Sequence, residues 1–122
     1  MGIVSNVSVP ISREIRECIQ NCRDCHAICM ETLAYCARLG GRFSEPEHLR
    51  LLLDCAEICA TGAGFMLRGS PLHERVCGVC EEVCRTCADD CARMGDDQQL
   101  RACADACRRC AESCHRMTTA QT

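Results

Sequence analysis

The sequence is poor in aromatic residues and contains no lysine. Its 122 residues include two phenylalanines, one tyrosine and no tryptophan. Because large aromatic side chains normally supply much of the buried area of a core, another residue type must fill that role. All fourteen basic residues are arginine, and seventeen interspersed acidic residues bring the net charge to −3. This balance gives no basic surface for nucleic acid.

The chain also shows no targeting or membrane signal. The N-terminal residues MGIVSNVSVPISREI contain neither the basic n-region nor the apolar h-region of a signal peptide. Position 6 is Asn, which breaks the myristoylation pattern, and no run of about eighteen apolar residues could cross a membrane. We therefore expect a cytosolic protein without a membrane partner. Because thiols stay reduced in the cytosol, its cysteines are expected to bind metal or to carry out redox chemistry.

Three short breaks divide the chain into four helical segments. The breaks are Gly40-Gly41, Gly69-Ser70-Pro71 and Gly95-Asp96-Asp97. The segments predict helices over about 12–39, 45–68, 71–94 and 97–117. Short connections make neighbouring helices antiparallel, so we predict an all-α, up-down-up-down four-helix bundle. The expected bundle domain spans 12–118, with an N-terminal arm at 1–11 and a C-terminal tail at 119–122.

Capping residues mark the starts of the predicted helices. The candidate N-caps are Ser12, Ser44, Ser70 and either Asp96 or Asp97. Glu47 lies three residues after Ser44, as in a capping box, and Pro71 after Ser70 suits the first helical position.

Cysteine is the abundant residue, and its spacing is that of the buried face of a helix. Successive cysteines within a segment are three or four residues apart, except for one interval of seven that spans two such steps. This spacing places them on the core-facing stripe of a bundle helix, where leucine normally stands. We therefore expect a lumen lined with sulfur. The sixteen residues are Cys18, Cys22, Cys25, Cys29, Cys36, Cys55, Cys59, Cys77, Cys80, Cys84, Cys87, Cys91, Cys103, Cys107, Cys110 and Cys114.

Three roles are open to such a stripe of thiols. Free cysteine packs as a small hydrophobe, but a core that needs small residues would use alanine interchangeably, and alanine lies beside this stripe. Disulfides between residues three or four apart are within reach, yet side-chain directions on a regular helix give them poor geometry. Metal ligation fits the repeated spacing best, because thiolates bind soft or borderline ions such as Cu(I) and Zn(II).

Charge favours Cu(I) over zinc. Four zinc ions, each with four ligands, would leave about half of the sixteen thiolate charges uncompensated, and such charge is costly to bury. Monovalent ions that bridge pairs of thiolates approach one ion per sulfur and neutralise the lumen. A two-coordinate ion needs sulfurs roughly 4.6 Å apart, and neighbours at i and i+4, with Cβ atoms about 5–6 Å apart, meet that need.

The cysteine pattern resembles that of the bacterial copper storage proteins. The resemblance rests on Cys-x-x-x-Cys-x-x-Cys-His-x-x-Cys over residues 18–29 and on the serial cysteines of 77–91 and 103–114, and it covers residues 12–117. The chain is most similar to the cytosolic branch, which lacks a leader. The resemblance implies a bundle that holds many Cu(I) ions and assembles as a homotetramer, with a copper chaperone as a candidate partner. The second helix departs from the pattern, because it carries only Cys55 and Cys59.

Continuing the same spacing identifies the residues at the two ends of the lumen. One end, called here the Met66 end, gathers Cys18, Met66, His73, Cys77, Cys114 and Met117. The other, the His48 end, gathers Cys36, His48, Cys91, Met94 and Cys103. Thioether and neutral imidazole are uncharged Cu(I) ligands. The candidate mouth ligands are His73, Met66, Met117, His48 and Met94.

We expect ions to load at the Met66 end, because it holds more soft ligands. Each candidate also has a simpler role: a methionine on the stripe serves as core filler, and His73 as a water-exposed residue of a first helical turn. His26 and His115 lie one position off the stripe, about 100° around the helix. These two are expected at the rim or the surface.

Storage or sequestration of Cu(I), for copper homeostasis or detoxification, is the function that the pattern favours. We expect no enzyme, since the stripe carries no Ser-His-Asp set or carboxylate pair and the chain has no phosphate-binding glycine motif. A thiol redox or oxidative-stress buffer is one alternative, and it requires exposed cysteines of low pKa. A Zn(II) or Cd(II) buffer like metallothionein is another. Apolar residues off the stripe on the first two helices predict self-association there.

Overall fold

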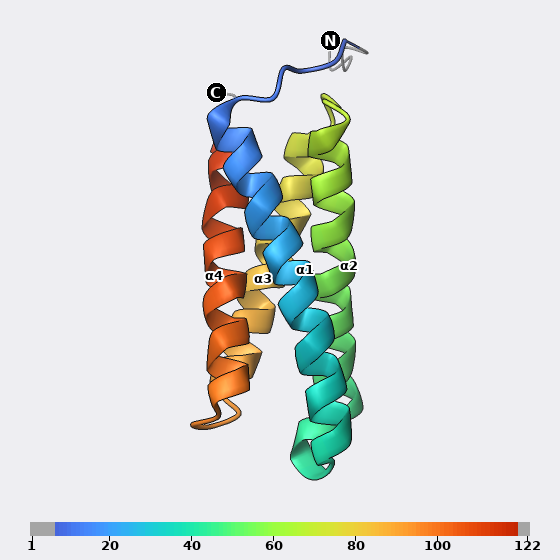
Figure 1. Ribbon diagram of the computed structural model, residues 1–122, viewed down its shortest axis with the longest axis vertical. Helices are drawn as coiled ribbons and strands as arrows, with labels where there is room; N and C mark the ends of the chain where they lie inside the picture. Colours follow the sequence, from blue (N-terminus) through green and yellow to red (C-terminus); the bar gives the residue numbers. More distant parts are fainter. Residues whose placement is uncertain (1–6, 120–122) are drawn as a thin grey trace.

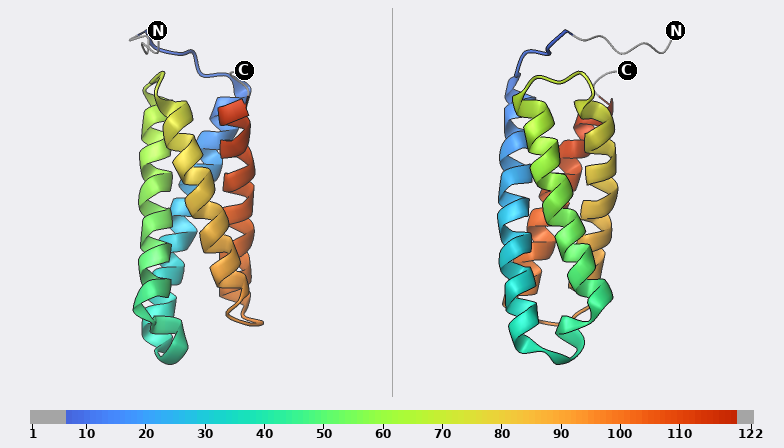
Figure 2. Two further views of the ribbon diagram at one scale, coloured as in Figure 1. Left: turned by 180° about the vertical axis from the view of Figure 1, so that it is seen from behind. Right: turned by 90° about the vertical axis from the view of Figure 1, so that its right-hand side faces the viewer.

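The chain forms a bundle of four antiparallel helices. The computed structural model describes residues 7–119; the parts of the expected arm and tail at 1–6 and 120–122 lie outside the described residues. The helices are α1 (Arg13–Leu39), α2 (Pro46–Leu67), α3 (His73–Ala92) and α4 (Gln98–Thr119), with a short 3-10 helix, η1 (Gly41–Ser44), after α1. Figures 1 and 2 show the up-down-up-down arrangement, which confirms the predicted fold. Each helix packs against two neighbours, and α1 contacts α2 and α4.

Two of the predicted N-caps are confirmed. The Ser12 hydroxyl accepts the Ile15 N–H at 3.2 Å at the start of α1. The Asp97 carboxylate accepts the Leu100 N–H at 3.0 Å at the start of α4. Each satisfies a backbone donor that a helix terminus leaves without an internal partner.

The predicted Ser44 cap is wrong, and α3 begins two residues later than predicted. Ser44 belongs to η1 and its hydroxyl donates to the Gly41 carbonyl, so no capping box forms and α2 starts after Glu45. The reason is that Gly40 and Gly41, with positive φ angles, end α1 and turn the chain directly into η1, which already includes Ser44. The helix predicted from Pro71 begins instead at His73, although Ser70 still accepts the Leu72 N–H.

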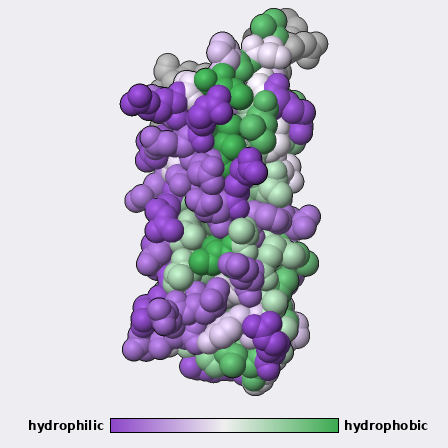
Figure 3. All heavy atoms as spheres, in the orientation of Figure 1, coloured by the Kyte–Doolittle hydropathy of each residue, from purple (hydrophilic) through white to green (hydrophobic). Residues whose placement is uncertain are grey.

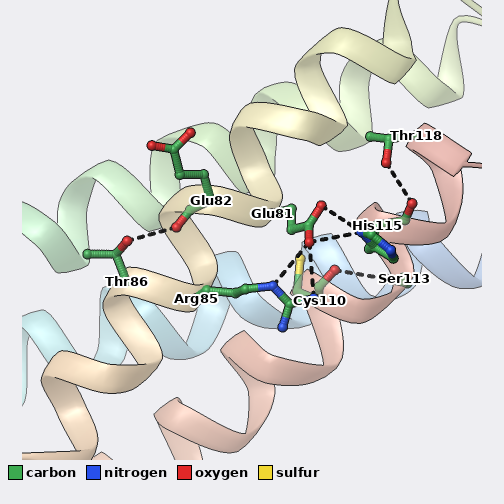
Figure 4. Close-up of polar contacts among 8 residues, drawn as sticks. All are labelled: Glu81, Glu82, Arg85, Thr86, Cys110, Ser113, His115 and Thr118. Atoms are coloured by element: carbon green, nitrogen blue, oxygen red, sulfur yellow. Dashed lines mark hydrogen bonds and ion pairs between the residues drawn. The ribbon is translucent and has the colours of Figure 1, made fainter.

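The outer faces of the bundle are polar on one side and partly apolar on the other. Figure 3 shows hydrophilic residues over the α4 side and hydrophobic ones gathered over α1 and α2. On the α3–α4 face, Glu81 accepts hydrogen bonds from His115 and from Arg85 at about 3.0–3.1 Å (Figure 4). This cluster joins the two helices at the surface. No helix within the described residues is long and apolar enough to cross a membrane.

Candidate metal centre

Sulfur fills the core of the bundle. All sixteen cysteines are free thiols, and each is at most 1% exposed. Large apolar side chains are few in the described core, where Leu52, Met66 and Leu100 are fully buried. The predicted sulfur-lined lumen is therefore what the bundle encloses.

Neighbouring sulfurs form a continuous path along most of the lumen. Contacts between Sγ atoms run from 3.5 to 4.0 Å. The path passes through Cys18, Cys114, Cys22, Cys110, Cys59, Cys84, Cys55, Cys25, Cys107, Cys29 and Cys103. Every contact on this path joins two different helices, whereas the sequence pointed only to pairs on one helix. An ion anywhere on the path would find two or more sulfurs within reach.

The sulfurs also converge in overlapping groups. Four groups of four cysteines and one of three have all their Sγ atoms within 4.8 Å of one another. The four-sulfur groups are Cys22/Cys80/Cys110/Cys114, Cys25/Cys55/Cys59/Cys84, Cys25/Cys29/Cys55/Cys107 and Cys59/Cys80/Cys84/Cys110. Because they share members, no more than two can be occupied at once without sharing a sulfur. The lumen therefore favours ions that share thiolates over separate tetrahedral sites.

The charge of ionised thiols in this lumen has no cation to balance it. In the described part of the chain no arginine is buried, and the buried polar residues are Thr32, His48, His73 and Ser113. The thiols instead hydrogen-bond one another. The hydrogen bond with Cys107 is the largest of several that lower the pKa of Cys25, whereas the hydrogen bond with Cys103 is the largest of several that raise the pKa of Cys107. Bound cations would supply the missing positive charge.

At the Met66 end, a histidine has an unused ring nitrogen. His73 is 2% exposed, and its Nδ1 lies 2.8 Å from the Ser70 carbonyl. A carbonyl only accepts, so Nδ1 carries a proton, and in the neutral tautomer with that proton Nε2 has a lone pair. Nε2 is buried and has no hydrogen-bond partner. A backbone carbonyl that fixes the tautomer in this way is typical of metal-ligating histidines.

Soft sulfur donors lie at the same end. Cys18, Cys77 and Cys114 form the three-sulfur group. The thioether of Met66 lies 3.9 Å from Cys77 Sγ, and both Met66 and Met117 are buried. The structure thus brings the six residues of the Met66 end to one end of the bundle, and His73 is not water-exposed.

At the His48 end, the histidine has both ring nitrogens engaged. His48 Nδ1 lies 2.5 Å from Asp90 and Nε2 lies 3.4 Å from Cys36 Sγ. Burial raises the pKa of Cys36 to about 11, with further contributions from the negative charges of Asp97, Cys103 and Asp90. Asp90 was not among the predicted site residues, because it lies beside the cysteine stripe. Its position directly before Cys91 was the available signal.

Three of the four helices carry a residue other than cysteine between Cys36 and the continuous path. Thr32 lies between Cys29 and Cys36 on α1, and its hydroxyl accepts from the Gln99 amide at 3.0 Å. Leu52 occupies the corresponding step on α2, and Leu100 precedes Cys103 on α4. All three are fully buried. The interval of seven in the cysteine spacing therefore marks a change in the lining.

The two off-stripe histidines lie where the spacing predicted. His26 is half-buried at the rim of α1, with Nδ1 2.8 Å from the Ala56 carbonyl on α2. His115 is exposed and contacts Glu81. Neither reaches the lumen.

Comparison with known proteins places the chain among copper-binding bundles. A family model described as copper storage protein matches residues 11–119. The Cu(I)-bound copper storage protein BsCsp3, whose metal-free counterpart is from Bacillus subtilis, is 31% identical, with a TM-score of 0.82 over 88% of this chain and 100% of that chain. A cytosolic copper storage protein from Streptomyces lividans, loaded with five coppers, is 29% identical, with a TM-score of 0.74 over 86% and 92% of the two chains.

A curated relative matches part of the chain. The cysteine-rich protein YhjQ of Bacillus subtilis (strain 168), itself uncharacterized, is 33% identical over 63 residues, or 52% of this chain. The match spans 58% of the length of that relative.

Proposed function

The chain belongs to the copper storage protein family, and we propose that it stores many Cu(I) ions in the cytosol for copper homeostasis or detoxification. The observation that carries this proposal is the continuous path of sulfur contacts, 3.5 to 4.0 Å apart, inside a lumen that holds no balancing cation. Low-coordinate Cu(I) ions that share thiolates would occupy such a path and neutralise it. The cytosolic relative loaded with copper supports both the ion and the compartment.

The proposed ligands are the sixteen cysteines, joined at the ends of the lumen by His73, Met66, Met117, His48 and Met94. The free lone pair of His73 Nε2 supports a ligand role for that residue. Loading is proposed at the Met66 end, which holds this nitrogen together with the buried sulfurs of Met66 and Met117 and the three-sulfur group. The function is binding without turnover.

Anaerobic titration of the reduced, metal-free protein tests the proposal. We expect Cu(I) to bind in large molar excess with the helical circular dichroism signal retained. In a parallel titration, Zn(II) should saturate at about two equivalents in closed four-thiolate sites, since the four-sulfur groups overlap. Tight zinc binding that Cu(I) cannot displace would favour the zinc buffer, and rapid thiol oxidation by dilute peroxide would favour the redox buffer.

A pair of cysteine variants tests the site. Cys110 belongs to two four-sulfur groups, whereas Cys36 belongs to none. Cys110→Ser should therefore lower the Cu(I) capacity by more than Cys36→Ser does. Equal losses would show that the overlapping groups do not organise the bound ions.

Two conservative variants test the mouth ligands. Met66→Leu and His73→Leu keep the approximate volume and remove the thioether and the imidazole. Both should slow Cu(I) uptake and leave the capacity within about one or two ions of the original, since the thiolates remain. Unchanged rates in both variants would refute loading through this end.

Assembly as a homotetramer and exchange with a copper chaperone complete the proposal. Large apolar side chains on α1 and α2 support self-association: Met30, Leu39, Leu53 and Leu67 are 40–50% exposed. Light scattering of the wild type and of a Leu53→Glu, Leu67→Glu double variant would decide it. A monomeric wild type would contradict the assembly but not the storage function.

A further inference from the structure

The N-terminal residues before α1 cross the end of the bundle. In Figures 1 and 2 this segment runs from the start of α1 towards the loop between α2 and α3. The Val9 N–H donates to the Gly69 carbonyl of that loop at 2.7 Å. Val9 and Ile11 are half-buried and pack against the core. Residues 7–11, called here the strap, thus cover the Met66 end.

Glycine is required where the strap meets the loop. Gly69 has φ +67°, a conformation that residues with a Cβ rarely adopt. A Cβ there would lie 2.7 Å from the Val9 carbonyl oxygen and 3.3 Å from the Val9 nitrogen. Both are backbone atoms, so an alanine could be accommodated only if the strap moved away.

The same loop holds the histidine of the Met66 end. Ser70, the residue after Gly69, presents the carbonyl that accepts from His73 Nδ1. The Ser70 N–H in turn bonds to the Phe65 carbonyl at 3.0 Å, at the end of α2. The loop therefore contacts the strap on one side and orients the His73 ring on the other.

The soft donors of the Met66 end are closed off from solvent. Cys18, Cys77 and Cys114 are fully buried, and His73, Met66 and Met117 are at most 3% exposed. In this conformation these donors present almost no surface to solvent. Something at this end has to move.

We propose that the strap is the movable closure of the Met66 end, and that it must lift for Cu(I) to enter or leave. The proposal rests on the proposed copper storage function. It adds a regulated step to that function, because lifting the strap both exposes the sulfurs and frees the loop that orients His73.

Two variants lift the strap by different means. Gly69→Ala places a methyl group against the Val9 backbone, and Val9→Pro removes the N–H that binds Gly69. The control is Arg42→Ala, which removes a hydrogen bond to the Met94 carbonyl at the other end of the bundle. Circular dichroism establishes that each variant remains helical.

The first readout needs no copper. Metal-free, reduced protein is treated with iodoacetamide, and the alkylation rate of each cysteine is followed by mass spectrometry. Both strap variants should label Cys18, Cys77 and Cys114 about tenfold faster, as expected for loss of one net hydrogen bond, with Cys36 and Cys91 unchanged. Arg42→Ala should not accelerate the first three. Equal acceleration at both ends, or none, in both strap variants overturns the proposal.

The second readout separates the strap from the storage function. Removal of Cu(I) by the chelator bathocuproine disulfonate should also be about tenfold faster in both strap variants, at unchanged capacity. If the wild type binds no Cu(I), the storage function fails while the alkylation rates still decide whether the strap closes this end. Copper release at the wild-type rate in both variants contradicts its gating role.

Discussion

The two ends of the bundle continue the same spacing of inward-facing residues, but only at one end do both ring nitrogens of the buried histidine have partners. At the His48 end, the ring nitrogens of His48 bind Asp90 and Cys36. At the Met66 end, His73 Nε2 is buried and has no hydrogen-bond partner. A buried polar atom without a partner costs free energy, so the Met66 end carries a cost that a bound ion would remove.

The ends also differ in how they are closed. Side-chain hydrogen bonds tie α1 and η1 to the loop between α3 and α4 and to the first turn of α4. They join Arg42 to the Met94 carbonyl at 2.7 Å, Tyr35 to Asp97 at 2.6 Å and Gln99 to Thr32 at 3.0 Å. The strap instead joins its loop through backbone atoms of Val9 and Gly69. We expect the three side-chain hydrogen bonds to keep the His48 end closed, and the strap to be the closure that opens.

Copper should produce the largest change and should act mainly on the Met66 end and the sulfur path. A ligand that binds only the folded state at a thousand times its Kd stabilises that state by about 4 kcal/mol. We therefore expect a rise of roughly 10 °C or more in the unfolding midpoint of the loaded protein. Anaerobic thermal denaturation followed by circular dichroism measures it.

Hydrogen exchange would locate that gain. Amides near Cys18, Cys77 and Cys114 should slow most on loading, and those around His48 least. Equal protection at both ends would mean that copper does not stabilise the Met66 end more than the His48 end. An unchanged unfolding midpoint would mean that bound copper does not stabilise the folded protein.

The next effect comes from His48→Leu. Removing the imidazole leaves the half-buried Asp90 carboxylate and the Cys36 thiol without their partner, although Arg93 still pairs with Asp90. We expect a loss of about 2 kcal/mol in the free energy of unfolding of the metal-free protein. Urea denaturation under reducing conditions measures it. A loss well below that value would mean that the His48–Asp90 contact contributes little.

The helices and the lumen were predictable because one physical rule sets both. Cysteines three and four residues apart lie on one helix face, and four such faces can only point inward. The N-cap of α2 was not predictable from Ser44, because the chain turns at the two preceding glycines into η1, which includes Ser44. The residues that line the lumen could be predicted from the sequence only where they are cysteines. The layer of Thr32, Leu52 and Leu100 corresponds in the sequence only to the longer interval between Cys29 and Cys36.

The hydrogen-bond partners of His48 and His73 could not be predicted from the sequence, for a related reason. Spacing along a helix fixes which face a side chain occupies, but not which atoms of another helix or loop meet it. Asp90 reaches His48 from α3, and the Ser70 carbonyl reaches His73 from a loop. These contacts engage both ring nitrogens of His48 and leave Nε2 of His73 without a hydrogen-bond partner.

The same substitution at the other end, His73→Leu, should have a much smaller effect on the metal-free protein. It removes a buried nitrogen that has no partner and loses one hydrogen bond to Ser70. These two contributions oppose each other, so we expect a change of less than about 1 kcal/mol in the free energy of unfolding. The same urea series measures both variants. A loss as large as that of His48→Leu would show that His73 is held by contacts as important as those of His48.

The smallest effect is expected from Tyr35→Phe, which tests whether acid weakens one end alone. The Tyr35 hydroxyl, together with the Leu100 N–H, holds the pKa of Asp97 below its usual value of 3.8. A carboxyl whose pKa is lower in the folded state contributes stability above its unfolded pKa, and that contribution is lost as the pH falls through the folded value. Acid below about pH 4 should therefore loosen the His48 end, whereas the backbone hydrogen bond of the strap has no group to titrate. In Tyr35→Phe, the pKa of Asp97 measured by NMR should rise, and the difference in stability from the wild type should vanish in acid. An unchanged pKa would mean that the tyrosine hydroxyl does not bind Asp97 in solution.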